Sequence, residues 1–128
     1  MIELANISKK FGQTSVLENL SLSVLPASRT VIVGPSGSGK TTLLRILAGF
    51  ETPDSGQIML SGKTLFDENT FVPAHQRGIG FVPQEGALFP HMKVGDNIAY
   101  GLHGSKHENR RRVAELMELV SLDSQLQH

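Results

Sequence analysis

The segment that most constrains this chain is Gly34–Phe50, GPSGSGKTTLLRILAGF, in which a glycine- and serine-rich stretch stands directly before a run of leucines. The four residues before it, TVIV at 30–33, form a short, unbroken run in which every residue is β-branched, which is typical of a strand buried on both faces of a parallel sheet. After the glycines, apolar residues recur at helical spacing at Leu43, Ile46 and Leu47, and Gly49 is placed to end the helix. The segment therefore predicts a strand, a loop and a helix.

The loop fits the pattern G-x-x-x-x-G-K-[ST] over Gly34–Thr41. Glycines adopt positive φ angles, which turn successive backbone N–H groups inward as a nest for an anion. The start of a helix near Gly39 adds free N–H donors and the positive end of the helix dipole. Lys40 can reach the β- and γ-phosphates of a nucleotide, and the Thr41 hydroxyl can ligate Mg²⁺. The alternative is a glycine-rich turn that happens to contain a lysine.

The residues around this unit predict further strands. Alternating apolar residues predict two antiparallel strands at 2–7 and 20–24, joined through a turn near Gly12 and Gln13. A turn at 52–56 precedes a short strand at 57–60. Residues 64–77 are expected to be irregular, with Phe66, Phe71 and Val72 as apolar anchors, and 79–82 to form another buried strand that Pro83 ends.

A second helix is predicted near the end of the chain. Ser105 and Glu108 form an S-x-x-E capping box. An apolar stripe follows at i, i+3, i+4 and i+7, formed by Val113, Leu116, Met117 and Val120. The run Arg110–Arg112 lies in the first turns, where positive charge opposes the helix dipole, and is either a solvated face or a contact for phosphate or lipid.

Composition excludes several classes. The 128 residues carry twelve basic and twelve acidic side chains, which argues against a nucleic-acid surface. The absence of cysteine excludes disulfides and thiolate metal sites. No apolar run is long enough for a spanning helix, the start shows no secretory signal, and the histidines have no metal-ligand spacing with carboxylates.

The order of motifs resembles a known family. Phe11-Gly12 precedes the glycine-rich loop, which is followed by ETPDSGQIMLSG and then by GIGFVPQEGALFPHMKVGDNIAYGL. Over its whole length the chain resembles the N-terminal part of an ABC transporter ATP-binding subunit. The segment from Val72 to Leu102 is similar to that of the ferric-iron importers, and importers for sulfate, polyamines and sugars share much of it.

The resemblance implies an α/β fold: a P-loop NTPase core of the ABC ATPase type with an N-terminal antiparallel β subdomain. It implies that residues 1–128 are the N-terminal part of a single nucleotide-binding domain, truncated before the signature and Walker B segments. The expected cofactors are ATP and Mg²⁺.

The resemblance also implies roles for individual residues. Phe11 matches the aromatic residue that stacks on adenine, although an ordinary core position is the alternative. Gln84 matches the glutamine that contacts Mg²⁺ and the attacking water, although its position alone also suits an ordinary loop residue. Lys40 and Gln84 are thus the expected catalytic residues, and Thr41 and Gln84 the expected Mg²⁺ ligands. Besides Phe11, the expected nucleotide-binding residues are Gly34, Pro35, Ser36, Gly37, Ser38, Gly39, Lys40, Thr41 and Thr42.

The expected partners follow from the same resemblance. Glu85–Tyr100 corresponds to the surface that receives a transmembrane permease subunit; its apolar side chains suit a docking groove or packing within their own domain, namely Leu88, Phe89, Pro90 and Met92. A second copy of the ATPase subunit is expected as a dimer partner, and a solute-binding protein as an indirect one. The expected location is peripheral, on the cytoplasmic side of the cell membrane, and no nucleic acid is expected.

Motifs needed for hydrolysis do not occur in the 128 residues. The family continues with an LSGGQ signature, an aspartate at a strand end, a catalytic glutamate and a switch histidine. We therefore expect that this stretch alone does not turn over ATP, although the parent protein does. We also expect unpaired edges beside the strand at 30–33 to leave the isolated stretch marginal, oligomeric or partly disordered.

Other classes are a soluble ABC module, a P-loop kinase or switch GTPase, and a protein that only binds nucleotide or a partner. The apolar segment after Gln84 favours a transporter over a soluble module. No N-K-x-D motif for guanine occurs, which argues against a GTPase.

Overall fold

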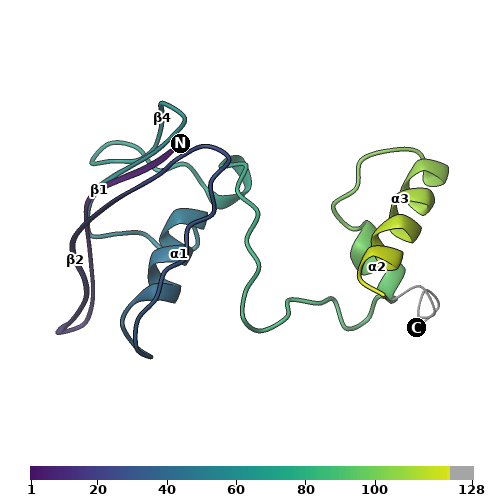
Figure 1. The fold of residues 1–128 in the computed structure, drawn as a ribbon, viewed down its shortest axis with the longest axis horizontal. Coiled ribbons are helices and arrows are strands. Elements are labelled where there is room, and N and C mark those ends of the chain that lie inside the picture. The colour runs from purple at the N-terminus through teal and green to yellow at the C-terminus, as the bar shows by residue number, and fades with distance from the viewer. Residues whose placement is uncertain (122–128) are drawn as a thin grey trace. The chain divides into compact units, whose positions relative to one another are not determined.

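The computed structural model describes residues 1–121 (Figure 1). Two compact units, Met1–Phe81 and Val82 onward, are described separately. The first unit contains, in order, β1 (Ile2–Phe11), β2 (Thr14–Val24), α1 (Lys40–Ala48), β3 (Ser55–Leu60), β4 (Lys63–Phe66) and the short 3-10 helix η1 (Ala74–Gln76). The second contains α2 (Val94–Ala99) and α3 (Lys106–Leu119).

The four strands form one antiparallel sheet in the order β2-β1-β3-β4. The predicted hairpin is confirmed, because β1 and β2 turn at Gly12 and Gln13 and pair Leu4 with Leu22. Gly12 has a φ of +58°, in the left-handed region that a tight turn needs. The strands are longer than the apolar alternation predicted, since strand pairing continues through their polar ends.

Irregularities in β1 and β2 explain why that alternation is imperfect. The register of the pair shifts between Leu4 and Ile7, and Asn6 has a φ of +53°. The Asn6 N–H donates to Ser21 Oγ at 3.0 Å instead of to a strand carbonyl. One extra residue reverses which face the next side chains occupy, so Leu4 and Ile7, three apart, are both buried in the core.

The expectation of an irregular chain from residue 64 was wrong for Thr64–Phe66, which form β4 together with Lys63. Ser61 and Gly62 make the connecting turn, with φ angles of +48° and +81°. Two successive positive φ angles are typical of the tight turn that joins antiparallel strands. Leu65 of β4 is fully buried, and burial of its side chain stabilises the pairing of β4 with β3.

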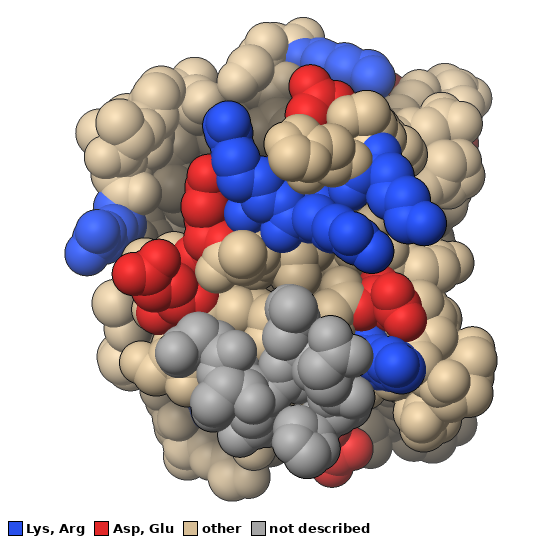
Figure 2. Space-filling view, turned by 90° about the vertical axis from the view of Figure 1, so that its right-hand side faces the viewer, with Lys and Arg blue, Asp and Glu red and all other residues tan. Residues whose placement is uncertain are grey.

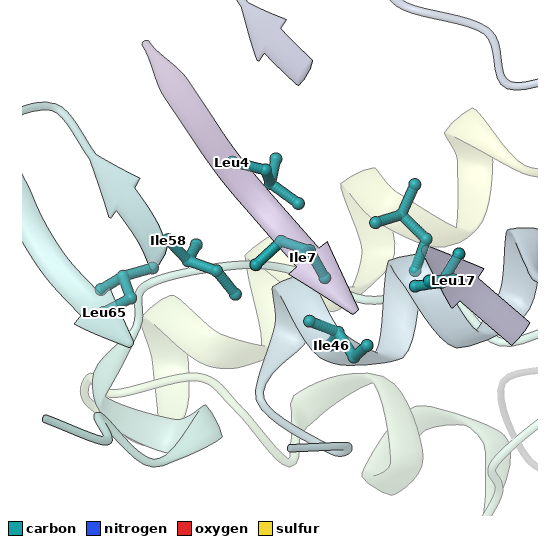
Figure 3. Packing of buried hydrophobic residues seen from close by; sticks show 7 residues of the cluster. Leu4, Ile7, Leu17, Ile46, Ile58 and Leu65 are labelled. Carbon is teal, nitrogen blue, oxygen red and sulfur yellow. The ribbon is translucent and has the colours of Figure 1, made fainter. Parts of the chain in front are cut away.

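The core of the first unit lies between the sheet and α1. It comprises seven buried apolar side chains: Leu4, Ile7, Leu17, Leu43, Ile46, Ile58 and Leu65. Figure 3 shows Ile7 of β1 and Ile46 of α1 pointing toward one another. The predicted helix and its end at Gly49 are confirmed, since Gly49 has a φ of +87° and donates to the Ile46 carbonyl. This packing holds α1 against one face of the sheet.

The predicted buried strands at 30–33 and 79–82 were wrong. Neither segment pairs with another strand within residues 1–121. Val31 and Val33 are 81% and 85% exposed, whereas Ile32 and Ile79 pack against the core. One side of each segment is therefore covered, but a strand of a parallel sheet requires backbone partners that the described residues do not supply.

In the second unit the predicted helix is confirmed as α3. Ser105 Oγ accepts from the Glu108 N–H and the Glu108 carboxylate accepts from the Ser105 N–H, as in a capping box. Val113 and Met117 are buried, but Val120 lies beyond the end of the helix and is exposed, so its place in the apolar stripe was wrong. The six-residue α2 was not predicted. Of the helices in residues 1–121, none combines the length and apolar character that crossing a bilayer requires.

Candidate functional site

The glycine-rich loop between residue 33 and α1 has the backbone that an anion nest needs. Gly37 and Gly39 have φ angles of +79° and +90°, in the left-handed region that favours glycine. Between them, the Ser38 N–H donates to the Pro35 carbonyl at 3.2 Å, which closes a tight turn. Alternating hands of the backbone turn neighbouring N–H groups to one side of the loop.

Gly39 is also required by space. A Cβ atom at this position would lie 2.9 Å from the Val16 carbonyl oxygen and 3.0 Å from a Leu17 methyl carbon. Strand β2 therefore packs directly under the start of α1, and any side chain at Gly39 would push the two apart. Gly37, by contrast, has open space around its Cα.

The first turn of α1 is left open to an external acceptor. Gly39 occupies the N-cap position, and no side chain caps the helix. The intrahelical ladder begins with the Leu43 N–H donating to the Gly39 carbonyl at 2.9 Å. The N–H groups before Leu43 have no helical partner, and with the helix dipole they make a favourable place for negative charge.

The Lys40 ammonium lies inside the loop that precedes it. Nζ donates to the carbonyl oxygens of Gly34 and Pro35, both at 2.7 Å, and to Ser38 Oγ at 3.3 Å. The ammonium therefore cross-links the two ends of the loop and lies beside the backbone N–H groups that would bind an anion. Thr41, next in the chain, is exposed and carries a hydroxyl oxygen on the first turn of α1, and Thr42 is half-buried.

Phe11 ends β1 and is 47% exposed, so the alternative that it is a core residue was wrong. One neighbour of the ring is the Lys9 Nζ, at 5.0 Å from the ring centroid. Such a distance is within the range of a cation–π contact. The other side of an aromatic ring placed in this way can accept a stacked planar group.

Gln84 lies at the start of the second unit and is exposed. Within residues 1–121 its side chain makes no hydrogen bond, and the contacts that join the loop residues to Lys40 do not include it. The structure thus brings together Gly34, Pro35, Ser38 and Lys40.

The segment 85–100 is organised by Asn97, which sequence reasoning missed. Its side-chain oxygen accepts from the Phe89 N–H at 2.8 Å. Its side-chain nitrogen donates to the carbonyl oxygens of Phe89, Met92 and Lys93, each at 3.1 Å. Asn97 is the fourth residue of α2 and follows a loop, a position from which a side chain can bond to the loop backbone. This role could have been predicted only if α2 itself had been predicted.

Apolar side chains of this segment are only partly used in packing. The Phe89 and Tyr100 rings pack with their centroids 4.4 Å apart and their planes tilted by 37°, whereas Leu88 is 75% exposed. A groove of about 670 Å³ between α2 and α3 is lined by charged residues of both helices and their caps, among them Lys93, Asp96, Lys106 and Arg110. Figure 2 shows Lys and Arg side chains gathered on the face that it views, with Asp and Glu beside them.

Arg77 is a second residue with an organising role that sequence reasoning missed. It is buried, and its guanidinium donates to the carbonyl oxygens of Ile46, Leu47 and Val72 at 2.7–3.0 Å. Burial lowers the pKa of this guanidinium below its usual value. Because two of its three partners, the carbonyls of Ile46 and Leu47, are at the end of α1, Arg77 caps the C-terminus of the helix whose N-terminus faces the loop.

Comparisons with known proteins find sequence relatives over almost the whole chain. The chain is 61% identical over 125 residues to the Fe(3+) ions import ATP-binding protein FbpC of Yersinia pestis bv. Antiqua, covering 98% of this chain and 36% of that protein. It is 58% identical over 125 residues to the protein of the same name from Serratia marcescens, with the same coverage. The chain thus spans little more than a third of the length of these relatives.

Solved structures show the same fold. A dimeric bacterial ABC transporter cassette superposes with a TM-score of 0.82 at 28% identity, covering 98% of this chain and 60% of that one. An ATP-bound bacterial Atm1-family ABC exporter gives a TM-score of 0.80 at 31% identity, covering 96% of this chain and 21% of that one. The family model described as ABC transporter matches residues 17–128, and the chain therefore belongs to the ABC transporter family.

Proposed function

We propose that this chain is the nucleotide-binding part of an ABC importer ATPase that couples ATP binding and hydrolysis to the uptake of ferric iron. The observation that carries the proposal is the loop at 34–40, where glycine backbone, an open helix N-terminus and the Lys40 ammonium converge. Main-chain donors and one mobile cation are what a polyphosphate requires. Iron as the transported solute is supported by the printed names of relatives 58–61% identical to this chain.

In this proposal the site residues have separate tasks. Residues 34–42 hold the phosphates, and Phe11 stacks on the adenine ring. Lys40 exchanges its contacts with the loop carbonyls for the β- and γ-phosphates, so its charge is in place before the nucleotide arrives. Gln84 orients the attacking water, as a neutral amide can do without being a strong base.

The chemistry of the Thr41 side chain suits a Mg²⁺ ion bound with the nucleotide. The exposed Thr41 hydroxyl on the first turn of α1 offers a hard oxygen, the type of donor that Mg²⁺ prefers. By its resemblance to the family's glutamine, Gln84 would supply an amide oxygen as a second ligand. Bound there, the ion would neutralise charge on the transferred phosphoryl group.

The partners follow from the same assignment. The segment 85–100, with its exposed apolar side chains and the adjacent groove between α2 and α3, would receive a transmembrane permease subunit. A second copy of the ATPase would complete the catalytic unit, and a solute-binding protein would deliver iron to the permease. The protein would then be peripheral, on the cytoplasmic side of the cell membrane.

Calorimetric titration of the full-length protein with Mg-ATP tests the nucleotide site. We expect Lys40→Ala to abolish detectable binding while the protein stays folded, and Lys63→Ala, at the first residue of β4, to bind as the native protein does. Unchanged affinity in Lys40→Ala would refute the assignment of the loop. Uptake of labelled ferric iron by cells, lost on deletion of the gene while sulfate, polyamine and sugar uptake continue, tests the transported solute. Failure to co-purify with any membrane subunit would favour a soluble ABC module instead.

A further inference from the structure

Lys9 has an unusual number of partners for a lysine near a strand end. Its Nζ donates to the Thr52 carbonyl at 2.8 Å and lies 3.0 Å from a Glu51 carboxylate oxygen and 3.8 Å from one of Asp54. Its side chain is only 12% exposed. An ammonium that satisfies a carbonyl and two carboxylates from a nearly buried position is fixed in place, unlike a mobile surface lysine.

The same ammonium lies over the Phe11 ring, 5.0 Å from its centroid. A phenylalanine at the exposed end of a hairpin otherwise samples several ring orientations, and ordering it on ligand binding costs conformational entropy. A fixed cation on one face restrains the ring by its attraction to the π system. Phe11 remains 47% exposed, which leaves surface for a planar ligand.

Lys9 also connects this ring to the phosphate-binding helix. Glu51 and Thr52, which hold Nζ, follow directly after α1, and the Glu51 N–H donates to the Arg45 carbonyl in the last turn of that helix. One series of contacts from the ring to the helix therefore passes through this ammonium. Movement of the turn after α1 would move the ring with it.

We infer that Lys9 is a positioning residue for the purine base: it holds the Phe11 ring in the orientation that stacks on adenine, in fixed relation to α1. This inference rests on the proposed nucleotide site. Lys9 does not touch the nucleotide in this account. Its contribution is preorganisation of the ring, so its effect is confined to ligands that carry a base.

The test compares two ligands in the full-length protein by competition against a fluorescent ATP analogue. Mg-ATP carries a base, whereas Mg-tripolyphosphate supplies the phosphates alone. We expect Lys9→Met to raise the Kd for ATP about fivefold, as loss of a cation–π contact and of ring order allows, and to leave that for tripolyphosphate within about twofold. Lys9→Arg, which keeps the cation, should restore ATP affinity. Lys10→Met, the neighbouring lysine whose side chain makes none of these contacts, is the matched control.

Two further variants keep the outcome decisive. Lys9→Gln can still donate to the Thr52 carbonyl but carries no charge, and we expect it to show the same selective loss for ATP if Lys9→Met does not fold. In a Phe11→Ala background, Lys9→Met should cause no further loss, because the two residues act through one ring.

Equal weakening of both ligands by Lys9→Met and Lys9→Gln would mean that Lys9 only supports the loop, and would overturn the inference. Unchanged ATP affinity in both variants would overturn it as well. Either result leaves the proposed nucleotide site standing as long as the native protein binds ATP. A native protein that binds neither ligand refutes both proposals together.

Discussion

The Arg77 guanidinium donates to the Ile46 carbonyl at 2.9 Å, across 31 residues of sequence. The carbonyls in the last turn of α1 have no intrahelical partner of their own, and a buried guanidinium with several donors can satisfy them together. Arg77, which follows η1, is thereby fastened to the helix that begins after the glycine-rich loop. Gly49 leaves room for this contact, since a Cβ there would lie 2.7 Å from Arg77 Nε.

Arg77→Met should therefore lower the free energy of unfolding by about 2–3 kcal/mol, because the buried Ile46 carbonyl and the partly buried Val72 carbonyl lose a charged donor. Denaturant unfolding of the full-length protein measures this loss. His75→Ala, an exposed substitution in η1, is the control and should change stability by less than about 0.5 kcal/mol. Equal stability of native protein and Arg77→Met would contradict the capping role.

Gly39→Ala and Gly37→Ala form a matched pair in the loop. Both glycines have positive φ, which costs an alanine about 1 kcal/mol, but only at Gly39 does the added Cβ meet a backbone oxygen, at 2.9 Å. We expect Gly39→Ala to destabilise the protein by about 2–4 kcal/mol in total and Gly37→Ala by about 1 kcal/mol. Thermal unfolding of the two variants measures the difference. Similar losses in both would show that β2 does not constrain the loop.

Asn97→Ala should loosen the loop at 89–93 without unfolding α1 or the sheet. The substitution removes four hydrogen bonds, worth together about 2 kcal/mol of local stability, so the Phe89 amide should exchange roughly 30-fold faster. Hydrogen exchange followed by mass spectrometry or NMR measures this rate. Asn109→Ala, which removes a single contact at 3.5 Å, is the control and should leave the exchange at Phe89 unchanged.

The capping box of α3 should make the start of this helix sensitive to acid. The Ser105 side chain, and then its backbone N–H, hold the pKa of Glu108 below its usual value. A lowered folded-state pKa contributes stability that is present above the unfolded pKa and is lost as pH falls through the folded one. NMR titration of the Glu108 carboxyl should give a pKa below the ordinary value near 4.3.

In Ser105→Ala the pKa of Glu108 should move back toward that ordinary value, and α3 should fray at its start at all pH values above it. An unchanged pKa in this variant would show that the hydrogen bond to Ser105 is not its cause.

Features encoded by neighbouring residues could be predicted from sequence. The turn at Gly12 and Gln13, the end of α1 at Gly49 and the Ser105–Glu108 box each depend on the conformational range or hydrogen bonding of a few adjacent residues. The same holds for the loop at 34–41, because its chemistry lies in the backbone that glycines permit. The loop could therefore be identified from sequence even though the strand expected at 30–33 does not form.

Features that depend on distant partners could not be predicted. The strand expected at 30–33 was wrong because strand formation requires a neighbouring backbone, and apolar character alone does not provide one. β4 and α2 were missed because their short segments carry little periodic signal. Arg77 and Lys9 appeared as ordinary polar residues, since their partners lie up to 45 residues away in the chain. Asn97 contacts residues only four to eight positions away, but its role depends on the fold of the loop before α2, which was not predicted.

The sequence by itself thus determined where backbone and charge could hold a polyphosphate, because glycine, lysine and a helix start act locally. Only the tertiary structure decided how that loop is supported: β2 beneath Gly39, Arg77 at the far end of α1, and Lys9 between Phe11 and the turn that follows the helix. The physical reason is that these supports are contacts at a few ångströms between residues far apart in the chain, and their formation depends on the packing of the whole unit.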